Sequence, residues 1–233
     1  MRDASLEVMR GELVCLIGPS GCGKSTLLNI MGGLMTPTAG EVEVLGRRVV
    51  APMPRDIAFV FQENALFPWN TVLDNINLGM VFQGVPRAAR DARAQRSLEA
   101  VGLADFAQHY PAQLSGGMRQ RAALARALSL ETGILLMDEP FGALDEQTRV
   151  LMGEWLLDIW RRTRKTVIFV THSLHEALFL STRVAVMTAR PGRIKATLDL
   201  AMEYPRSMES SEMVTLRAKL WREIREESLR AMR

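Results

Sequence analysis

Short apolar runs recur along this chain and alternate with stretches in which the apolar residues have the spacing of a helix face. The runs are rich in Val, Ile and Leu and lie at residues 13–17, 57–61, 134–137, 167–170 and 184–187. Runs of this length are typical of buried strands, and their alternation with helical stretches is typical of a mostly parallel sheet covered by helices. The pattern therefore predicts an α/β domain.

One long segment lacks strand signals altogether. Between about residues 71 and 130 the pattern is helical, with breaks at residues 84–86, at Gly102 and at Pro111. Gly and Pro interrupt helices because Gly favours unusual backbone angles and Pro lacks an N–H donor. We expect a helical subdomain here, inserted in a domain of residues 1–200.

Two features lie outside the main alternation. A strand pair is expected at residues 41–45 and 47–50, as part of a small, partial antiparallel layer. A short strand follows Pro191-Gly192, and residues 201–233 then form a charged C-terminal helical extension. One face of that helix is apolar, and packing on the domain is favoured over partner binding; the residues on this face are Met213, Leu216, Leu220 and Ile224.

Composition excludes several classes of protein. With 48% hydrophobic and 24% charged residues, a 233-residue chain can bury a sizeable core, so disorder is excluded. The net charge of +3 is too small to indicate a nucleic-acid partner. No apolar run is long enough to cross a bilayer and no signal-peptide pattern is present, so a membrane connection would depend on a partner. Cys15 and Cys22 indicate neither a disulfide nor a metal site.

A glycine-rich run directly after the first predicted strand is the strongest functional signal. It fits the phosphate-binding pattern Gly-x4-Gly-Lys-Ser/Thr and predicts a P-loop NTPase of RecA-like type that binds ATP or GTP. Backbone N–H groups and the positive end of the following helix dipole would face the phosphates, with Lys24 on the β and γ phosphates and Ser25 on Mg²⁺. The residues of the run are Gly18, Pro19, Ser20, Gly21, Cys22, Gly23, Lys24, Ser25 and Thr26.

Two carboxylates follow the apolar run at residues 134–137. Asp138 and Glu139 would lie at the carboxyl edge of the sheet, where open α/β sheets bind ligands and where the phosphate loop also lies. Asp138 is a candidate Mg²⁺ ligand and Glu139 a candidate base for an attacking water. Two acids after a strand can also form an exposed turn, but behind a phosphate loop the catalytic interpretation is favoured.

A second helix start that suits an anion lies at Ser115-Gly116-Gly117. Ser115 has the position of an N-cap, and the two glycines expose backbone N–H groups. Together with the order of the phosphate loop and the Asp138-Glu139 pair, this string resembles the signature motif of ABC-type ATPases. The chain is similar to the ATP-binding subunits of ABC transporters over nearly its whole length.

The resemblance implies roles for further residues. Gln62 resembles the Q-loop glutamine that senses Mg²⁺ and the attacking water, Asp145 the D-loop aspartate at the dimer seam, and His172 the switch histidine near the γ phosphate. In this family two cassettes pair head to tail around ATP. The signature residues Ser115, Gly116, Gly117 and Gln120 would therefore contact the nucleotide of the partner subunit.

A finer resemblance concerns transport. Residues 67–75 and 187–194 resemble the nitrate, sulfonate and taurine importer ATPases. This implies a homodimer, or a pair with a second ABC subunit, at the cytoplasmic face of the inner membrane. It also implies contact with permease subunits, and indirectly with a solute-binding protein, but not with nucleic acid. Phe67 and Trp69 would line the groove that receives a permease helix, although an aromatic cluster that only packs the inserted helices is the alternative.

Two alternatives remain open at this point. One is a soluble ABC ATPase that works without a permease. The other is an N-terminally truncated cassette with impaired nucleotide binding, because the family has a strand and an adenine-stacking aromatic residue farther upstream of Gly18 than this sequence extends.

Overall fold

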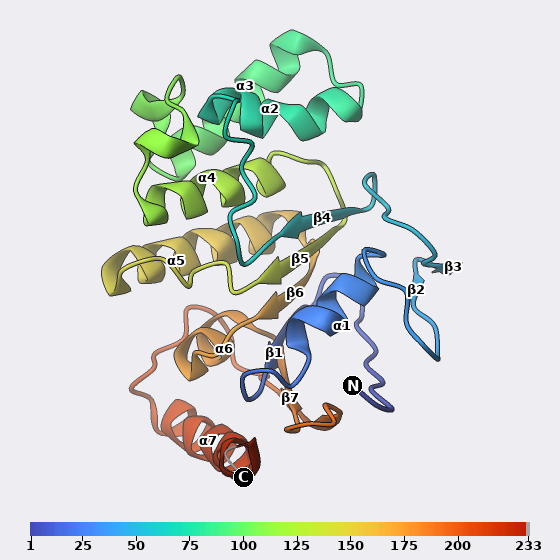
Figure 1. Ribbon diagram of the computed structural model, residues 1–233. Coiled ribbons are helices and arrows are strands. Elements are labelled where there is room, and N and C mark those ends of the chain that lie inside the picture. Colours follow the sequence, from blue (N-terminus) through green and yellow to red (C-terminus); the bar gives the residue numbers. More distant parts are fainter. Residues whose placement is uncertain (232–233) are drawn as a thin grey trace.

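The computed structural model describes residues 1–231 and contains a central six-stranded sheet (Figure 1). Five strands are parallel to their neighbours and the last pairs antiparallel at one edge. This confirms the predicted mostly parallel sheet. In spatial order the strands are β4 (Ile57–Val60), β5 (Ile134–Asp138), β6 (Thr166–Val170), β1 (Leu13–Ile17), β7 (Arg183–Met187) and β8 (Ile194–Asp199).

Helices cover both faces of this sheet (Figure 1). One face carries α1 (Lys24–Met31) together with the small hairpin of β2 (Glu43–Val44) and β3 (Arg47–Arg48). The other face carries most of the remaining helices. Their bounds are α2 (Val72–Phe82), α3 (Arg87–Ala100), η1 (Ala104–Phe106), η2 (Pro111–Gln113), α4 (Gly116–Leu128), α5 (Glu146–Thr163), α6 (Leu174–Leu180) and α7 (Ser211–Ala231).

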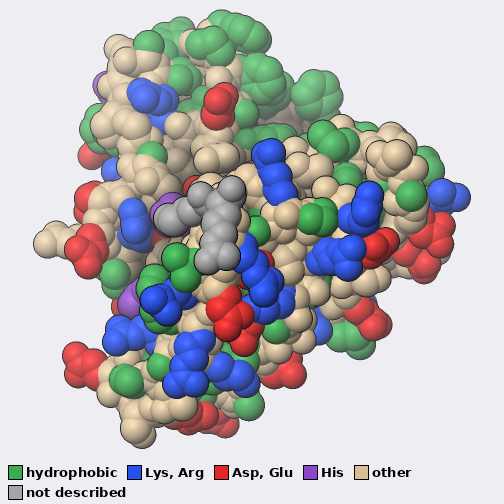
Figure 2. Space-filling model, turned by 60° about the horizontal axis from the view of Figure 1, so that its bottom comes forward, with side chains coloured by type: hydrophobic (Ala, Val, Ile, Leu, Met, Phe, Trp, Pro, Cys, Tyr) green, Lys and Arg blue, Asp and Glu red, His purple; other side chains and the backbone are tan. Residues whose placement is uncertain are grey.

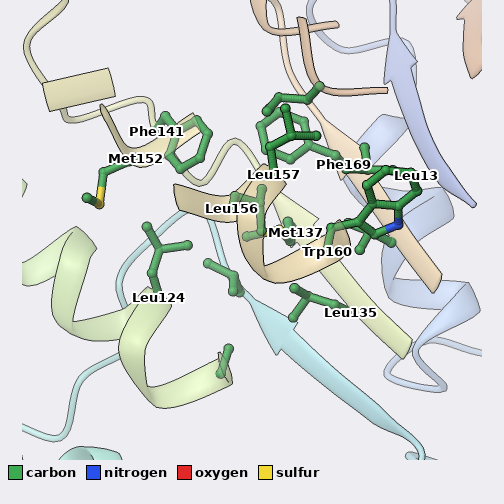
Figure 3. Packing of buried hydrophobic residues seen from close by; sticks show 14 of the residues in the cluster. Leu13, Leu124, Leu135, Met137, Phe141, Met152, Leu156, Leu157, Trp160 and Phe169 are labelled. Carbon is green, nitrogen blue, oxygen red and sulfur yellow. The ribbon is translucent and has the colours of Figure 1, made fainter. Parts of the chain in front are cut away.

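The side chains of β1 show why the strands read as continuous apolar runs. Leu13, Cys15 and Ile17 face the larger hydrophobic cluster, whereas Val14 and Leu16 face the cluster under α1, and all are at most 1% exposed. A strand buried on both faces needs apolar residues at every position. Figure 3 shows the larger cluster, in which strand residues such as Leu135 and Phe169 pack against α5.

The inserted helices end where the sequence predicts. Gly84 and Gly102 follow α2 and α3 with φ angles of +76° and +65°, a region in which a residue with a Cβ is strained. Helix α4 contacts α2 and α3 but also the edge strand β4, so it joins the inserted segment to the sheet. The hairpin is shorter than predicted, since only two residues of each strand pair.

Helix α7 packs on the domain, as its apolar face predicts. Met213, Leu220 and Ile224 are buried in the larger cluster and Leu216 packs against it. None of the helices in residues 1–231 combines the length and the apolar content needed to cross a membrane. Figure 2 shows hydrophobic side chains gathered at the upper end of the molecule, whereas charged side chains of both signs mix over its lower part.

Candidate functional site

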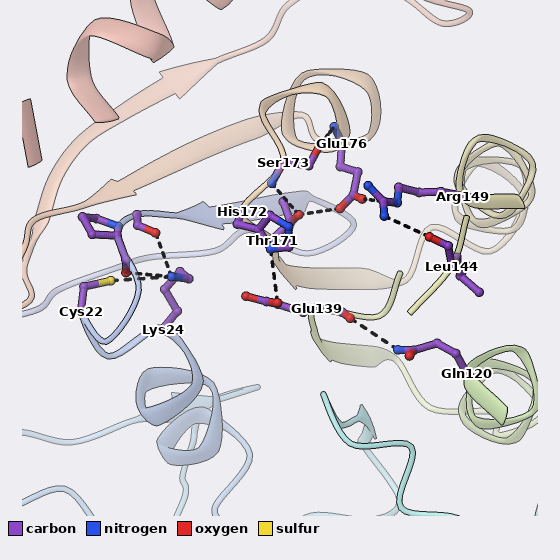
Figure 4. A network of polar contacts seen from close by, with 12 residues as sticks. Cys22, Lys24, Gln120, Glu139, Leu144, Arg149, Thr171, His172, Ser173 and Glu176 are labelled. Carbon is purple, nitrogen blue, oxygen red and sulfur yellow. Dashed lines mark hydrogen bonds and ion pairs between the residues drawn. The ribbon is translucent and has the colours of Figure 1, made fainter. Parts of the chain in front are cut away.

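Four loops meet at the carboxyl edge of the parallel strands, where the sequence predicts a ligand. They follow β1, β5, β6 and β4 and carry the phosphate loop, Glu139, His172 and Gln62. Backbone hydrogen bonds continue the sheet into the loops: Glu139 N donates to Val170 O at 3.0 Å, and Thr171 N donates to Leu16 O at 3.2 Å. The candidate site thus lies on rigid strand ends (Figure 4).

The phosphate loop leads into a helix start that lacks a side-chain cap. Gly23 precedes α1 with a φ of +109°, no side chain caps the helix, and its first turn contains no acidic residue. The first N–H groups of a helix have no partner within the helix, and together with the helix dipole they favour a bound anion. The start of α1 is therefore a suitable place for phosphate.

Lys24 lies across this loop. It is 7% exposed, and its Nζ donates to Gly18 O at 2.8 Å and to Pro19 O at 3.0 Å. The Cys22 thiol lies 4.0 Å from the same nitrogen and is buried. The loop carbonyls hold the ammonium group at the mouth of the helix, where it can exchange a carbonyl for a phosphate oxygen.

Asp138 carries an oxygen that suits a cation. Its side chain is 6% exposed, and Oδ1 is buried without a hydrogen-bond partner among residues 1–231. Burial raises the pKa of the Asp138 carboxyl; the Ser25 hydroxyl opposes this rise, repulsion from Glu139 adds to it, and Lys24 opposes it. A buried carboxylate oxygen without a partner, beside a hydroxyl, offers the kind of oxygen ligand that Mg²⁺ binds.

Glu139 and His172 lie together at the same edge. His172 Nδ1 is 3.3 Å from Glu139 Oε2, and the Glu139 side chain is 23% exposed. The backbone of Glu139 has a φ of +45°, which is unusual for a residue with a Cβ and common at functional sites. A partly exposed carboxylate held next to an imidazole can orient water and take its proton.

Gln120 lies in the first turns of α4 with the signature residues, but its side chain is buried. It is 2% exposed, and its Nε2 donates to the backbone oxygen of Glu139 at 3.4 Å in the same chain. The amide is thus used inside its own chain, and the contact of Gln120 with a nucleotide on another subunit stays a prediction. Gln120 ties α4 to the turn that carries Glu139.

The start of α4 lies beside the segment before α5. Ser115 is exposed and its Oγ accepts from Met118 N at 3.2 Å, which makes it the N-cap as predicted. A Cβ on Gly117 would touch Leu144 and Ala143, so the small residue allows close packing there. Asp145 caps α5, and the pKa of Asp145 is lowered by the hydrogen bond from Thr148 N. Within residues 1–231 no hydrogen bond or ion pair joins Ser115 or Asp145 to Lys24.

Gln62 is exposed two residues after β4 ends. The described part of the chain gives its side chain no hydrogen bond to Asp138, Glu139 or Lys24. The structure therefore brings Lys24, Ser25, Asp138, Glu139 and His172 to one edge. Gln62 follows β4 at the same edge, but within residues 1–231 no hydrogen bond joins it to these residues.

A buried polar network next to His172 was not predicted. Thr171 Oγ1 donates to Glu176 at 2.5 Å, and Arg149 pairs with Glu176 at 3.6 Å while it donates to Leu144 O at 3.0 Å (Figure 4). Burial raises the pKa of Glu176, which Thr171 and Arg149 partly oppose. The network joins the loop of His172 to the segment before α5. Its only sequence signal is a Glu inside an apolar helix.

An apolar groove of about 450 Å³ lies between the edge strand β4 and helices α2 and α4. Phe67 lines it as predicted. Trp69 is 72% exposed and lies outside the lining, with its ring tilted by 51° to that of Phe67 at a centroid distance of 5.5 Å. Phe82, which the sequence reasoning missed, lines the groove and is 82% exposed. The buried Asn75 amide fixes the loop, because it accepts from Phe67 N and donates to Phe67 O.

Comparisons with known proteins agree with this arrangement. A family described as ABC transporter matches residues 1–142. An uncharacterized ABC transporter ATP-binding protein of Methanocaldococcus jannaschii is 47% identical over 99% of this chain and 86% of that protein. A taurine import ATP-binding protein of Pseudomonas aeruginosa is 48% identical over 88% of this chain and 78% of its own length. A nitrate import ATP-binding protein of Synechocystis sp. is 46% identical over 86% and 75%.

Solved structures of the same kind share the fold. The dimeric structure of a bacterial ABC transporter cassette superposes with a TM-score of 0.80 at 35% identity and covers 86% of this chain and 90% of that chain. The dimeric structure of a post-hydrolysis state bound to ADP and Pi superposes with a TM-score of 0.78, also at 35% identity and with the same coverage.

Proposed function

Because this chain belongs to the ABC transporter family of ATP-binding proteins, we propose that it is the ATP-hydrolysing subunit of an importer for a small oxoanion or sulfonate. ATP hydrolysis follows from the family and from the post-hydrolysis state of a solved neighbour. The solute class is supported by the relatives named for taurine and nitrate import. The subunit would lie at the cytoplasmic face of the cell membrane, where it would bind permease subunits. A solute-binding protein would deliver the solute to these permease subunits.

The uncapped start of α1 supports the position of ATP most directly. Its free N–H groups and Lys24 converge on the loop of residues 18–26, so this loop would hold the β and γ phosphates. On binding, Lys24 Nζ would move from a loop carbonyl to a phosphate oxygen, and this exchange preserves the hydrogen bonds of a buried ammonium group.

The residues near Asp138 fit a magnesium ion. Asp138 Oδ1 and the Ser25 hydroxyl are hard oxygen donors, and residues 1–231 hold no cluster of three acidic, His or Cys side chains that would form a complete site. This suits Mg²⁺, which usually keeps waters and phosphate oxygens as ligands. When bound, Mg²⁺ would neutralise charge on the β and γ phosphates.

Glu139 would act as the base for the attacking water. Its backbone is fixed by Val170 O and by Gln120, so its carboxylate has little freedom to leave the site. His172, whose Nδ1 lies 3.3 Å from Glu139 Oε2, would orient this carboxylate and contact the γ phosphate. Gln62 would join only after its exposed loop moves toward the nucleotide, which would make hydrolysis depend on the position of that loop.

A second subunit would complete the site. Ser115 is exposed and Gly116 and Gly117 are partly exposed at the start of α4, and within residues 1–231 none of the three has a hydrogen bond to Lys24. In a head-to-tail homodimer they would cap the γ phosphate held by the partner, so ATP would join the two surfaces and hydrolysis would release them. The dimeric state of the solved neighbour supports this arrangement.

The apolar groove of Phe67 and Phe82 would receive a permease helix. An exposed aromatic side chain at the rim of an apolar groove is typical of a helix-in-groove contact. Phe82 is a better anchor than Phe67, because its side chain is 82% exposed whereas that of Phe67 is 37% exposed.

Replacement of Phe82 tests the contact with a permease. Phe82→Glu is expected to weaken membrane association by about 30-fold or more, the size of one aromatic anchor in an interface. The measurement is the fraction of chain that pellets with native membranes. Val81→Glu is the matched control, since Val81 is exposed on the same helix but lies outside the groove.

A photoreactive side chain at position 82 identifies the partner in the same cells. The proposal expects a crosslink to a protein with several transmembrane helices. An unchanged membrane fraction for Phe82→Glu, with no such crosslink, would remove the permease from the proposal and favour an ATPase that works without one.

A further inference from the structure

The turn after β7 packs directly against the phosphate loop. Arg190 Nε donates to Gly21 O at 2.9 Å. A Cβ on Gly192 would fall 1.9 Å from Cys22 O, so only glycine allows the two backbones to come this close. The two segments therefore pack as one unit.

Helix α7 holds this turn in place. The Glu227 side chain is 1% exposed, and its Oε2 accepts from Ala189 N at 2.9 Å. The other oxygen of Glu227 lies 2.9 Å from Arg230 and 3.3 Å from Lys195. A buried carboxylate costs stability unless it is paired and hydrogen-bonded, and Glu227 meets both conditions next to the turn.

Neighbouring acids on α7 show how specific this contact is. Glu226 also pairs with Lys195, at 2.8 Å, but its side chain is 62% exposed. Within residues 1–231, Glu226 has no hydrogen bond to the turn, whereas Glu227 accepts one from the turn backbone. The lower part of Figure 2 shows that charged side chains of both signs mix on this side of the molecule.

We propose that Glu227 is a positioning residue for the nucleotide site. Through Ala189 and Arg190 it braces Gly21 and Cys22, so the C-terminal helix sets the geometry of the phosphate loop. Several N–H groups must point to one place to bind a phosphate. A phosphate loop with greater mobility therefore has a lower affinity for the nucleotide, even when the fold is intact. This inference rests on the proposed position of ATP on residues 18–26.

Three variants of the full chain test the brace. Glu227→Ala is expected to raise the KM for MgATP by roughly three- to tenfold with kcat nearly unchanged, because part of one charged hydrogen bond is lost from ground state and transition state alike. Glu227→Gln keeps an acceptor for Ala189 N and should restore most of the affinity. Glu226→Ala loses only a surface pair and should leave the KM unchanged.

Hydrogen exchange reads the loop without any nucleotide. The amides of residues 18–23 should exchange faster in Glu227→Ala than in Glu226→Ala, while the amides of β5 should not change. Arg190→Ala, at an exposed position, should raise the KM for MgATP in the same way without unfolding the protein. The double variant should be less than additive, since both changes break one connection.

Two results would overturn the brace. One is a KM for MgATP and a loop exchange rate that stay unchanged in folded Glu227→Ala. The other is an equal rise in Glu226→Ala, because that would assign the effect to Lys195. These results differ from failure of the proposed nucleotide site, which would appear as normal MgATP binding in Lys24→Met whatever Glu227 does.

Discussion

Glu139→Gln is expected to lower the rate of ATP hydrolysis by about 10²- to 10⁴-fold, the usual contribution of a general base. The amide keeps the size of the side chain, and the backbone contacts with Val170 and Gln120 do not involve the replaced atoms. ATP binding should therefore survive, and the nucleotide-bound dimer should accumulate because the γ phosphate is no longer removed. Phosphate release and the mass of the complex in MgATP measure the two effects.

Glu146→Gln is the matched control for this experiment. Glu146 is exposed in the first turn of α5 and has no place in the proposed chemistry. It should hydrolyse ATP at the wild-type rate. Normal turnover in Glu139→Gln would discard Glu139 as the base and leave His172 or Gln62 to explain the activation of water.

Lys24→Met is expected to weaken MgATP binding by roughly ten- to a hundredfold, the size of one or two charged hydrogen bonds to phosphate. It also removes the donor for Gly18 O and Pro19 O, so some stability will be lost with it. Titration with a fluorescent ATP analogue measures binding, and thermal melting measures stability.

Lys165→Met separates the two effects. Lys165 also donates to two backbone carbonyls, Leu130 O and Thr132 O, and burial lowers the pKa of Lys165. It lies near the amino end of β6, at the opposite edge of the sheet from the phosphate loop. This variant should lose stability but bind MgATP normally. Equal loss of binding in both variants would mean that Lys24 acts through the fold and not on the phosphate.

The sequence predicted those features that depend on local chemistry. Residues 13–17 are apolar at every position because the strand is buried on both faces, and Ser115 caps α4 because its Oγ satisfies Met118 N. Glu139 follows β5 and His172 follows β6. Because these two strands are parallel neighbours in the sheet, the two side chains meet at its edge. Pattern and order along the chain contain this information.

The remaining features depend on packing between distant segments. The sequence around Gln120 does not predict that its amide turns inward to Glu139 O. The sequence around Phe82 does not predict a groove. Glu227 reads as one more acid on a charged helix, although it is the one that reaches the turn of Ala189. The contact of Gln120 joins residues 19 positions apart, that of Glu227 joins residues 38 positions apart, and the groove lies between three elements. The periodicity of the sequence cannot predict contacts of this kind.

Photolabelling in a mixed dimer tests most directly whether two chains share each ATP. An isotope-labelled Lys24→Met chain, which should not hold ATP on its own loop, is mixed with unlabelled wild-type chain and an ATP analogue that carries a photoreactive γ-phosphate group. We expect the photoreactive analogue to attach to the peptide around Ser115 of the isotope-labelled chain, because that chain would cap the nucleotide held by its wild-type partner. Label found only on the chain with an intact Lys24 would contradict the shared site.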